Sequence, residues 1–218
     1  INLHGGMLPQ YRGSSPMNWA LINGEREFGL SVIRLAPGVD TGDVLIERRF
    51  PIGPDDTIRD LHATANTAFP EMLLEALDGL EAGTLRPRAQ DEAQARYFPL
   101  RFPEDGFILF DQFTAEEVHN RIRALTEPYP CAYSYFKGRR VRLLSSRLHT
   151  GRFHGEPGRV YRIQGRELLV CARDRCLWIT DARFDDGGAL SDAVTRYERL
   201  ACATGLLETM LTQGGRQC

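Results

Sequence analysis

The sequence lacks the features of a membrane or secreted protein. It holds no apolar run near the roughly 18 residues that a spanning helix needs, and no basic start leads into an apolar stretch as in a signal peptide. Cysteine is sparse, and its five residues form no CxxC pair. We therefore expect neither a disulfide framework nor a zinc site, but free thiols in a reducing cytoplasm.

Net charge is almost absent as well. With 27 basic and 29 acidic side chains the formal charge is −2, so bulk electrostatics argue neither for nor against a polyanion as partner. Residues 101–166 are an exception, with 12 basic and seven acidic side chains. Part of this excess lies in the run 137–142 (KGRRVR). Such a run is typical of the solvated face of an edge strand and, less often, of a contact with tRNA or a nucleotide diphosphate.

The first half of the chain predicts alternating helix and strand. Residues 5–16 are dense in glycine and proline, which indicates a loop. Pro16 then suits the first turn of a helix that stops at Asn23-Gly24. Apolar and β-branched residues predict strands over 28–35 and 44–50, joined by a tight loop. A capping box at Thr57 opens a further helix of the first half, which ends near Gly83.

The second half predicts a β-rich domain. A second capping box at Thr114 opens a helix there. Short β-rich runs separated by Gly-containing turns follow, which favours a small β-barrel, and a last helix is expected over 195–212. We assign residues 1–95 to an α/β domain, 96–105 to a polar linker and 106–218 to the β-rich domain.

Asn2 and His4 are the first candidates for chemistry. They stand two residues apart on a presumed strand, so both side chains point to one face. They lie just before a Gly-rich loop, where α/β sheets bind ligands. An Asn amide can donate to a developing oxyanion, and an imidazole can donate or accept a proton. Asp40 lies in a loop that could fold back and orient His4. Each residue also has an ordinary structural interpretation, as a strand-end or turn residue.

Two longer motifs favour the chemical interpretation. The stretch from Asn2 to Pro16 (NLHGGMLPQYRGSSP) and residues 38–43 (GVDTGD) together resemble the signature of the 10-formyltetrahydrofolate-dependent formyltransferases. The resemblance implies a partial Rossmann-like domain with a parallel sheet, followed by a small OB-like β-barrel domain with helices. It implies a catalytic triad of Asn2, His4 and Asp40, with 10-formyltetrahydrofolate as co-substrate. No metal or covalent intermediate is implied.

The loop residues around this triad are then candidates for binding substrate or folate: Tyr11, Arg12, Gly13, Gly38 and Thr41. Arg12 is expected to meet a phosphate or carboxylate. The glycines are expected to serve backbone conformation or close approach.

The second domain resembles one branch of the family. Residues 103–106 and 118–130 (PEDG and VHNRIRALTEPYP) are similar to the formyltransferase part of the bifunctional enzymes that modify lipid A with aminoarabinose. That branch implies formyl transfer to the primary amine of a nucleotide-linked amino sugar, such as UDP-4-amino-4-deoxy-L-arabinose. The expected partner is a nucleotide sugar rather than a nucleic acid, in a cytoplasmic enzyme, and a homo-oligomer is left open.

Three alternatives remain. A methionyl-tRNA formyltransferase would share the triad and the folate, but would need an extended basic surface for the tRNA acceptor arm. A formyltetrahydrofolate hydrolase would transfer the group to water. A non-catalytic binding module is the alternative of another class, because family members carry a long segment before the Asn-x-His strand. Ile1 is typical of the end of a strand rather than of a natural start, so we expect the natural chain to continue upstream.

Overall fold

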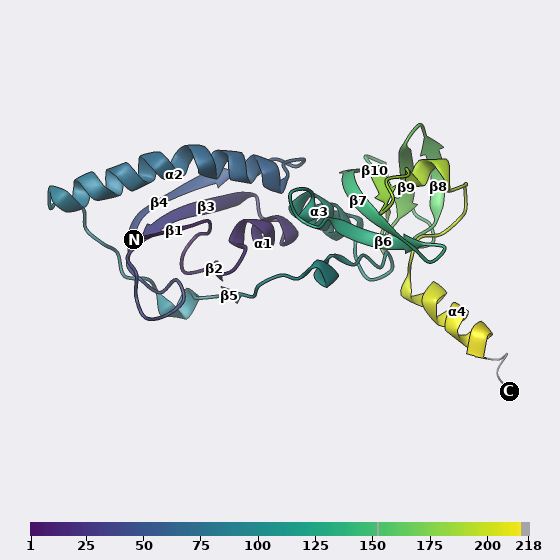
Figure 1. The fold of residues 1–218 in the computed structure, drawn as a ribbon, viewed down its shortest axis with the longest axis horizontal. Helices are drawn as coiled ribbons and strands as arrows, with labels where there is room; N and C mark the ends of the chain where they lie inside the picture. The colour runs from purple at the N-terminus through teal and green to yellow at the C-terminus, as the bar shows by residue number, and fades with distance from the viewer. Residues whose placement is uncertain (152, 215–218) are drawn as a thin grey trace. The chain divides into compact units, whose positions relative to one another are not determined.

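A computed structural model of the protein describes residues 1–151 and 153–214. The chain divides into two compact units, Ile1–Phe102 and Pro103–Cys218 (Figure 1). Each unit buries its own set of apolar side chains. The expected α/β class is confirmed, whereas the boundaries assigned to the linker at 96–105 stay a prediction.

The first unit is built on a three-stranded sheet in the order β1-β3-β4. β1 spans Asn2–His4, β3 spans Glu27–Ile33 and β4 spans Val44–Pro51. Both strand pairs are antiparallel, so the parallel pairing implied by the resemblance does not occur among these strands. Parallel neighbours need a crossover of a dozen or more residues, and the short loop 34–43 instead returns the chain alongside β3.

Two helices and a second small sheet complete this unit. α1 spans Pro16–Ile22, and α2 spans Ile58–Glu81 and packs on β3 and β4 (Figure 1). β2 (Arg12–Gly13) pairs in parallel with β5 (Tyr97–Phe98), which follows the 3-10 helix η1 (Glu92–Gln94). The chain after α2 therefore returns to the loop that follows β1.

Local signals in the sequence account for both helices. Pro16 occupies the first turn of α1 as predicted. At the start of α2 the backbone N–H of Thr57 donates to Oδ2 of Asp60 over 2.8 Å, the contact that a capping box predicts. The core of the unit includes apolar side chains that are at most 2% exposed: Leu21, Leu30, Val32, Ile58, Leu61 and Met72.

The second unit is built on a five-stranded antiparallel sheet in the order β6-β7-β10-β9-β8. The strands are β6 (Ala132–Phe136), β7 (Arg139–Leu148), β8 (Val160–Gln164), β9 (Glu167–Cys171) and β10 (Cys176–Phe184). The expected β-rich domain is confirmed. Within the described residues, however, the sheet is not a closed barrel, because the edge strands β6 and β8 do not pair with each other.

A stretch without regular structure takes the place of that pairing. The N–H of Tyr197 donates to the carbonyl of Val160 in β8 over 2.7 Å, and the N–H of Ala201 donates to the carbonyl of Tyr135 in β6 over 2.9 Å. Segment 197–201 thus satisfies backbone groups at both edges of the sheet.

This segment also corrects the last predicted helix. We expected a helix over 195–212, and α4 instead spans Ala203–Gly214. The backbone of 197–201 is engaged by the sheet edges and is not available for helical hydrogen bonds. Apolar periodicity cannot reveal such a competition, because the sheet partners lie far away in the sequence.

Shorter helical elements flank the sheet. η2 spans Pro103–Gly106, α3 spans Ala115–Leu125 and packs on β7, and η3 spans Leu190–Asp192. α3 begins with the predicted capping box. The N–H of Thr114 donates to Oε2 of Glu117 over 2.7 Å, and the N–H of Glu117 donates to Oγ1 of Thr114 over 3.2 Å.

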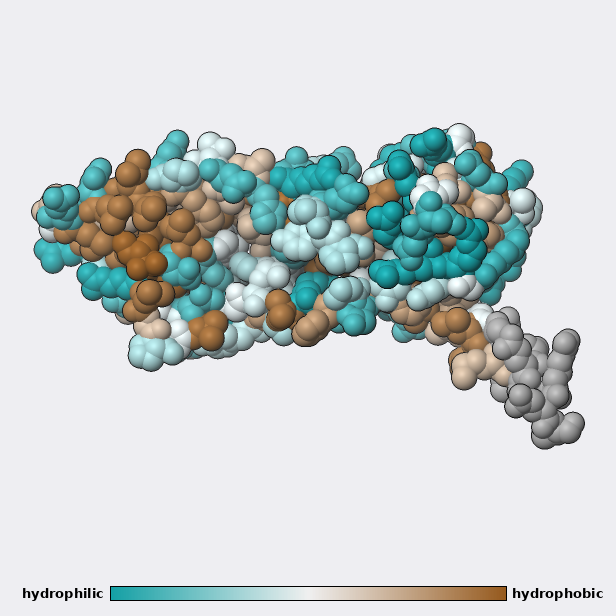
Figure 2. Space-filling view, in the orientation of Figure 1, coloured by the Kyte–Doolittle hydropathy of each residue, from teal (hydrophilic) through white to brown (hydrophobic). Residues whose placement is uncertain are grey.

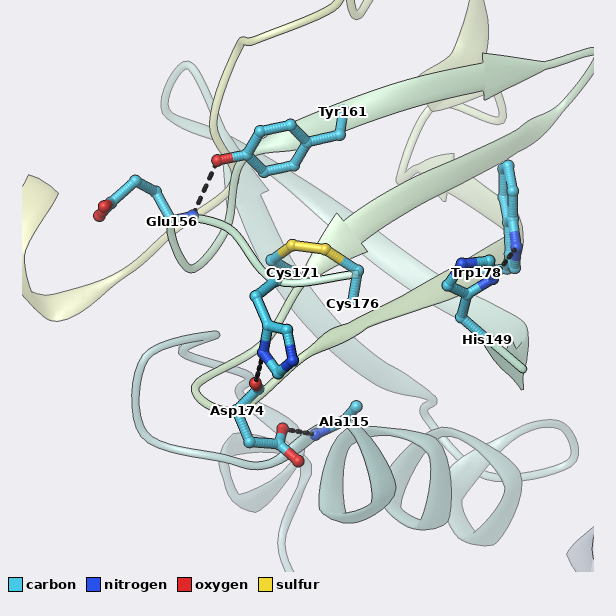
Figure 3. The surroundings of a disulfide bond; sticks show 9 residues. Ala115, His149, Glu156, Tyr161, Cys171, Asp174, Cys176 and Trp178 are labelled. Atoms are coloured by element: carbon cyan, nitrogen blue, oxygen red, sulfur yellow. Dashed lines mark hydrogen bonds between the residues drawn. A yellow bond between two sulfur atoms is a disulfide. The ribbon is translucent and has the colours of Figure 1, made fainter. Parts of the chain in front are cut away.

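Two cysteines are joined in a tight hairpin. Cys171 of β9 lies opposite Cys176 of β10, and a disulfide bond links them (Figure 3). The expectation of free thiols is therefore wrong for this pair, because the antiparallel register places the two side chains next to each other. Cys131 and Cys202 are free and buried, and Cys218 lies outside the described residues.

Apolar side chains also reach the surface of the first unit. Ile1 and Leu3 of the β1 region and Leu74 and Leu77 of α2 are exposed. In Figure 2 a hydrophobic surface extends over the part of this unit near the N-terminus. None of the helices among the described residues has the length and apolarity that a bilayer crossing requires.

Candidate active site

β1 carries the first two candidate residues. His4 lies opposite Ser31 of β3, and Asn2 stands two residues earlier on β1. Both side chains contact the same carboxylate. Nδ2 of Asn2 donates to Oδ1 of Asp40 over 3.4 Å, and Nδ1 of His4 lies 3.5 Å from Oδ2 of Asp40. The structure thus brings Asn2, His4 and Asp40 into one cluster.

Asp40 is held by an unusual backbone conformation and by the loop after β1. Its φ is 52°, a left-handed value that non-glycine residues adopt only when their surroundings support it. Oδ2 of Asp40 accepts a hydrogen bond from the N–H of Gly13 over 2.9 Å. Gly13 has a φ of 98°, and an added Cβ would overlap the carbonyl of Phe98. Only glycine fits there, and it serves the cluster by holding Asp40.

The ring of His4 is 6% exposed and is contacted on both nitrogens. Nε2 lies 2.6 Å from the carbonyl oxygen of Tyr11, and Nδ1 faces Asp40. Each contact is favourable only when its nitrogen carries a hydrogen. Gly6 allows the loop to fold over the ring, since a Cβ there would lie 2.9 Å from Nε2 of His4 and 2.8 Å from the carbonyl of Tyr11.

Tyr11 supports this loop with its side chain as well. Its hydroxyl donates to Oε1 of Glu25 over 2.7 Å, and its ring stacks on Phe98 with 4.8 Å between the centroids. Burial is the main cause that raises the pKa of Tyr11 to about 12, so the hydroxyl stays a donor at neutral pH. A contact of Tyr11 with substrate or folate stays a prediction.

Arg12 is fully buried and faces acceptors of its own chain. Its Nη1 and Nη2 donate to the two carboxylate oxygens of Glu92 over 2.9 and 2.6 Å, and Nη1 also donates to the hydroxyl of Tyr97 over 2.7 Å. The hydrogen bond with Glu92 raises the pKa of Arg12 and lowers the pKa of Glu92. We expected Arg12 to meet a carboxylate or phosphate. Here it meets Glu92, and a ligand contact stays a prediction.

Gly38 and Thr41 lie in the loop between β3 and β4. A Cβ at Gly38 would come within 2.7 Å of Oγ1 of Thr41, so the two residues are close neighbours. Gly38 is exposed and Thr41 is half-buried. Among the hydrogen bonds of the described residues, none joins the side chain of Thr41 to Asn2 or His4. The structure does not bring them into the cluster, and their binding role stays a prediction.

The sequence did not predict the two residues, Gln90 and Glu92, whose side chains bond the loops that carry Asp40 and Arg12. Nε2 of Gln90 donates to the carbonyl oxygens of Asp40 and Gly42, both over 2.7 Å, and Glu92 pairs with Arg12. Both lie in a polar stretch without a period. The pairing of β2 with β5 brings this stretch back to the loop after β1, but two-residue strands leave no pattern in a sequence.

The cluster offers an amide donor and an imidazole on either side of one carboxylate, each no more than 3.5 Å from it. An amide N–H can stabilise a developing oxyanion. An imidazole supported by a carboxylate can transfer a proton. In the part of the chain that the structure describes, no three or more His, Cys, Asp or Glu side chains gather as a metal site would require.

Two protein-family models match the chain. Residues 1–77 match the formyl transferase model, and residues 102–194 match the model of the formyl transferase C-terminal domain. The first match contains Asn2, His4 and Asp40, and the second contains all five strands of the larger sheet.

Several relatives cover most of the chain. Methionyl-tRNA formyltransferase from Solibacter usitatus is 38% identical over 84% of this chain and 58% of its own length. A structure of methionyl-tRNA formyltransferase from Clostridium thermocellum is 26% identical, with a TM-score of 0.57, over 68% of this chain and 63% of that one. HypX from Aquifex aeolicus in complex with tetrahydrofolic acid is 26% identical, with a TM-score of 0.61, over 84% of this chain and 32% of that one.

These matches correct the expected acceptor. Six curated relatives, 35–40% identical to the chain, are methionyl-tRNA formyltransferases. The expectation of a nucleotide-sugar acceptor, with no nucleic acid as partner, is therefore wrong. The N-formyltransferase from Helicobacter canadensis, solved with folinic acid and dTDP-3-aminofucose, is 22% identical with a TM-score of 0.68, which shows a shared fold alone.

Three polar residues of the stretch 118–130, on which the sugar expectation partly rested, serve the interior of the second unit. His119, Asn120 and Arg123 are all buried. Nδ1 of His119 lies 2.9 Å from Oγ of Ser146, and Nε of Arg123 donates to Oδ1 of Asn120 over 2.9 Å. Buried residues that bond within the domain are needed for its fold, so their presence does not identify the acceptor.

The chain spans between 51 and 60% of the length of the six curated relatives. Within that span the two family models follow each other in chain order, one on each structural unit. The two family matches confirm the resemblance to formyltransferases and the Rossmann-like assignment of the first domain. This chain therefore carries both the formyl transferase domain and the formyl transferase C-terminal domain of the formyltransferase family.

Proposed function

We propose that this chain carries the formyl-transfer site of a methionyl-tRNA formyltransferase, with 10-formyltetrahydrofolate as the formyl donor. The observation that carries the proposal is the cluster of Asn2, His4 and Asp40 inside the segment that matches the formyl transferase model. The acceptor is inferred from the curated relatives. The folate donor is supported by the tetrahydrofolic acid bound in HypX.

The proposed reaction is a direct transfer between two amines. The amine of the methionyl group attacks the formyl carbon, a new C–N bond forms, and the bond from that carbon to N10 of the folate breaks. The attacking amine loses one proton and N10 gains one, so the reaction needs no oxidant or reductant. Charge develops on the formyl oxygen as the new bond forms, and a donor aimed at that oxygen lowers the barrier.

Asn2 is suited to be that donor. An Asn amide nitrogen carries two hydrogens, and within the described residues the side-chain nitrogen of Asn2 makes one hydrogen bond, to Asp40. The second hydrogen is left for the formyl oxygen. His4 is the group that exchanges a proton with the attacking amine, through Nε2, which must give up its contact with the carbonyl of Tyr11 for one with the amine. Asp40 faces its Nδ1 and keeps the ring oriented.

The second unit offers groups that suit a nucleic-acid acceptor. The guanidinium of Arg140 lies 4.0 Å from the ring centroid of Tyr133, and that ring stacks on Phe107 with 5.4 Å between the centroids. Arginine next to stacked aromatic rings can contact both phosphates and bases. The mild basic excess of residues 101–166 also favours a nucleic-acid acceptor.

The experiment separates the possible acceptors. The protein produced from the complete reading frame that contains this chain is given 10-formyltetrahydrofolate with methionyl-tRNA, with a nucleotide-linked amino sugar, or with no amine. We expect formylmethionyl-tRNA, and no product from N-acetylmethionyl-tRNA, which lacks the free amine. Transfer to the sugar alone, or release of formate without transfer, contradicts the proposal.

A further inference from the structure

Gln90 lies between the two loops that build the candidate active site. It follows α2 and is half-buried. Its side-chain oxygen accepts a hydrogen bond from Nε of Arg12 over 3.0 Å. Its side-chain nitrogen donates to the carbonyl oxygens of Asp40 and Gly42, both over 2.7 Å. One side chain thus joins the loop after β1 to the loop between β3 and β4.

Arg12 determines which way the Gln90 amide points. A guanidinium carries only donors, so Nε of Arg12 requires the amide oxygen, and the amide nitrogen is left to face Asp40. Arg12 is itself fixed, because it is fully buried and bonded to Glu92 and Tyr97. Both hydrogens of the amide nitrogen are then used, one on each carbonyl. A flipped amide would lose all three contacts.

The two carbonyls that Gln90 holds flank Thr41, on the turn that carries Asp40. This turn includes the left-handed backbone of Asp40, which depends on its surroundings for support. The position of the turn decides whether the Asp40 carboxylate can reach both the N–H of Gly13 and the ring of His4. A side chain that bonds the backbone on both sides of the turn is placed to control that position.

We propose that Gln90 is a positioning residue for formyl transfer. Through its two bonds to the backbone it holds the Asp40 turn so that the carboxylate stays against His4. The inference rests on the proposed function, because it takes Asp40 as part of the formyl-transfer site. Gln90 acts through Asp40, since its side chain bonds Arg12 and the backbone of Asp40 and Gly42.

Two variants separate this role from simple support of Arg12. Gln90→Glu keeps the size of the side chain and gives Arg12 a stronger, charged acceptor, but it offers no N–H to the two carbonyls. Gln90→Met removes the polar contacts on both sides without adding charge. Gln94→Glu is the matched control, since Gln94 is an exposed residue of the same segment and the variant adds the same charge.

In steady-state formylation of methionyl-tRNA by the complete protein, kcat should fall about a hundredfold in both Gln90 variants, the loss expected for about 1 Å of misplacement. The KM values for both substrates, and all constants of Gln94→Glu, should stay close to those of the wild type. A kcat that is preserved in Gln90→Glu and lost in Gln90→Met would overturn the proposal, because the amide would then serve Arg12 alone. A preserved kcat in both variants would overturn it as well.

The amide of Gly13 gives a second readout that needs no turnover. Its N–H donates to Oδ2 of Asp40, so its proton resonance in ¹H–¹⁵N spectra should move upfield in both Gln90 variants and stay in place in Gln94→Glu. An unchanged Gly13 resonance in the Gln90 variants rejects the positioning role. If the wild type forms no formylmethionyl-tRNA, the proposed function fails, and the Gly13 resonance still decides whether Gln90 holds Asp40.

Discussion

The carboxylate of Asp40 lies 3.5 Å from Nδ1 of His4, and the same carboxylate oxygen accepts the N–H of Gly13 over 2.9 Å. A strand and two loops therefore meet at one charged group. If the proposed reaction is correct, this charge orients the group that moves the proton. Its removal should then affect turnover more than folding.

Replacing Asp40 by Asn tests this expectation, because Asn removes the charge and is among the residues that tolerate a left-handed backbone. We expect kcat for formyl transfer to fall by up to about 10²–10⁴-fold, the usual contribution of the general acid–base group that Asp40 orients, with little change in thermal unfolding. Asp43→Asn in the same loop is the control. Equal kinetics in both variants would argue against a chemical role for Asp40.

Gly6→Ala should disturb His4 by direct contact. The added Cβ would lie 2.9 Å from Nε2 of His4 and 2.8 Å from the carbonyl of Tyr11, and overpacking of this kind costs about 1–3 kcal/mol. Gly5→Ala is the matched control, since its Cβ would meet the flexible end of Met17 at 3.1 Å. Urea unfolding of both variants measures the difference. A Gly6→Ala protein as stable as Gly5→Ala would disprove the tight packing over the ring.

Glu92 should make the stability of the chain depend on acid pH. The hydrogen bond from Arg12 is the main cause that lowers the pKa of Glu92. A carboxylate with a lowered folded-state pKa stabilises the fold above its unfolded pKa of about 4.3, and this contribution is lost as the pH falls through the folded value. Glu92 is 69% exposed, so the effect is modest.

The comparison of wild type with Glu92→Gln measures that contribution. We expect the variant to unfold at a lower temperature than the wild type at pH 7. Between about pH 5 and pH 3 the wild type should lose stability more steeply, because only it has this carboxylate to protonate. Parallel unfolding temperatures across this range would show that the pair of Arg12 and Glu92 adds nothing to stability.

The sequence predicted well those elements whose signals are local. Pro16 marked the start of α1, and the capping boxes at Thr57 and Thr114 marked the starts of α2 and α3. Alternation along β1 predicted that Asn2 and His4 would share a face, and both contact Asp40. Each of these signals lies within a few residues of the feature that it predicts.

The remaining features depend on partners far away in the sequence. The backbone of 197–201 bonds to two sheet edges, which no local pattern records, and so the predicted helix began too early. Arg12 is buried because Glu92, Gln90 and Tyr97 return to it. The acceptor was also predicted wrongly, since buried residues such as His119 report on the fold and not on the substrate.

The most direct test of the account is the rate of formyl transfer to methionyl-tRNA by Asn2→Ala in the protein from the complete reading frame. Loss of one oxyanion donor should lower kcat by about 10²–10³-fold. Asn66→Ala, at an exposed position of α2, should leave kcat unchanged. If Asn2→Ala turns over at the rate of the wild type, the cluster of Asn2, His4 and Asp40 is not the formyl-transfer site.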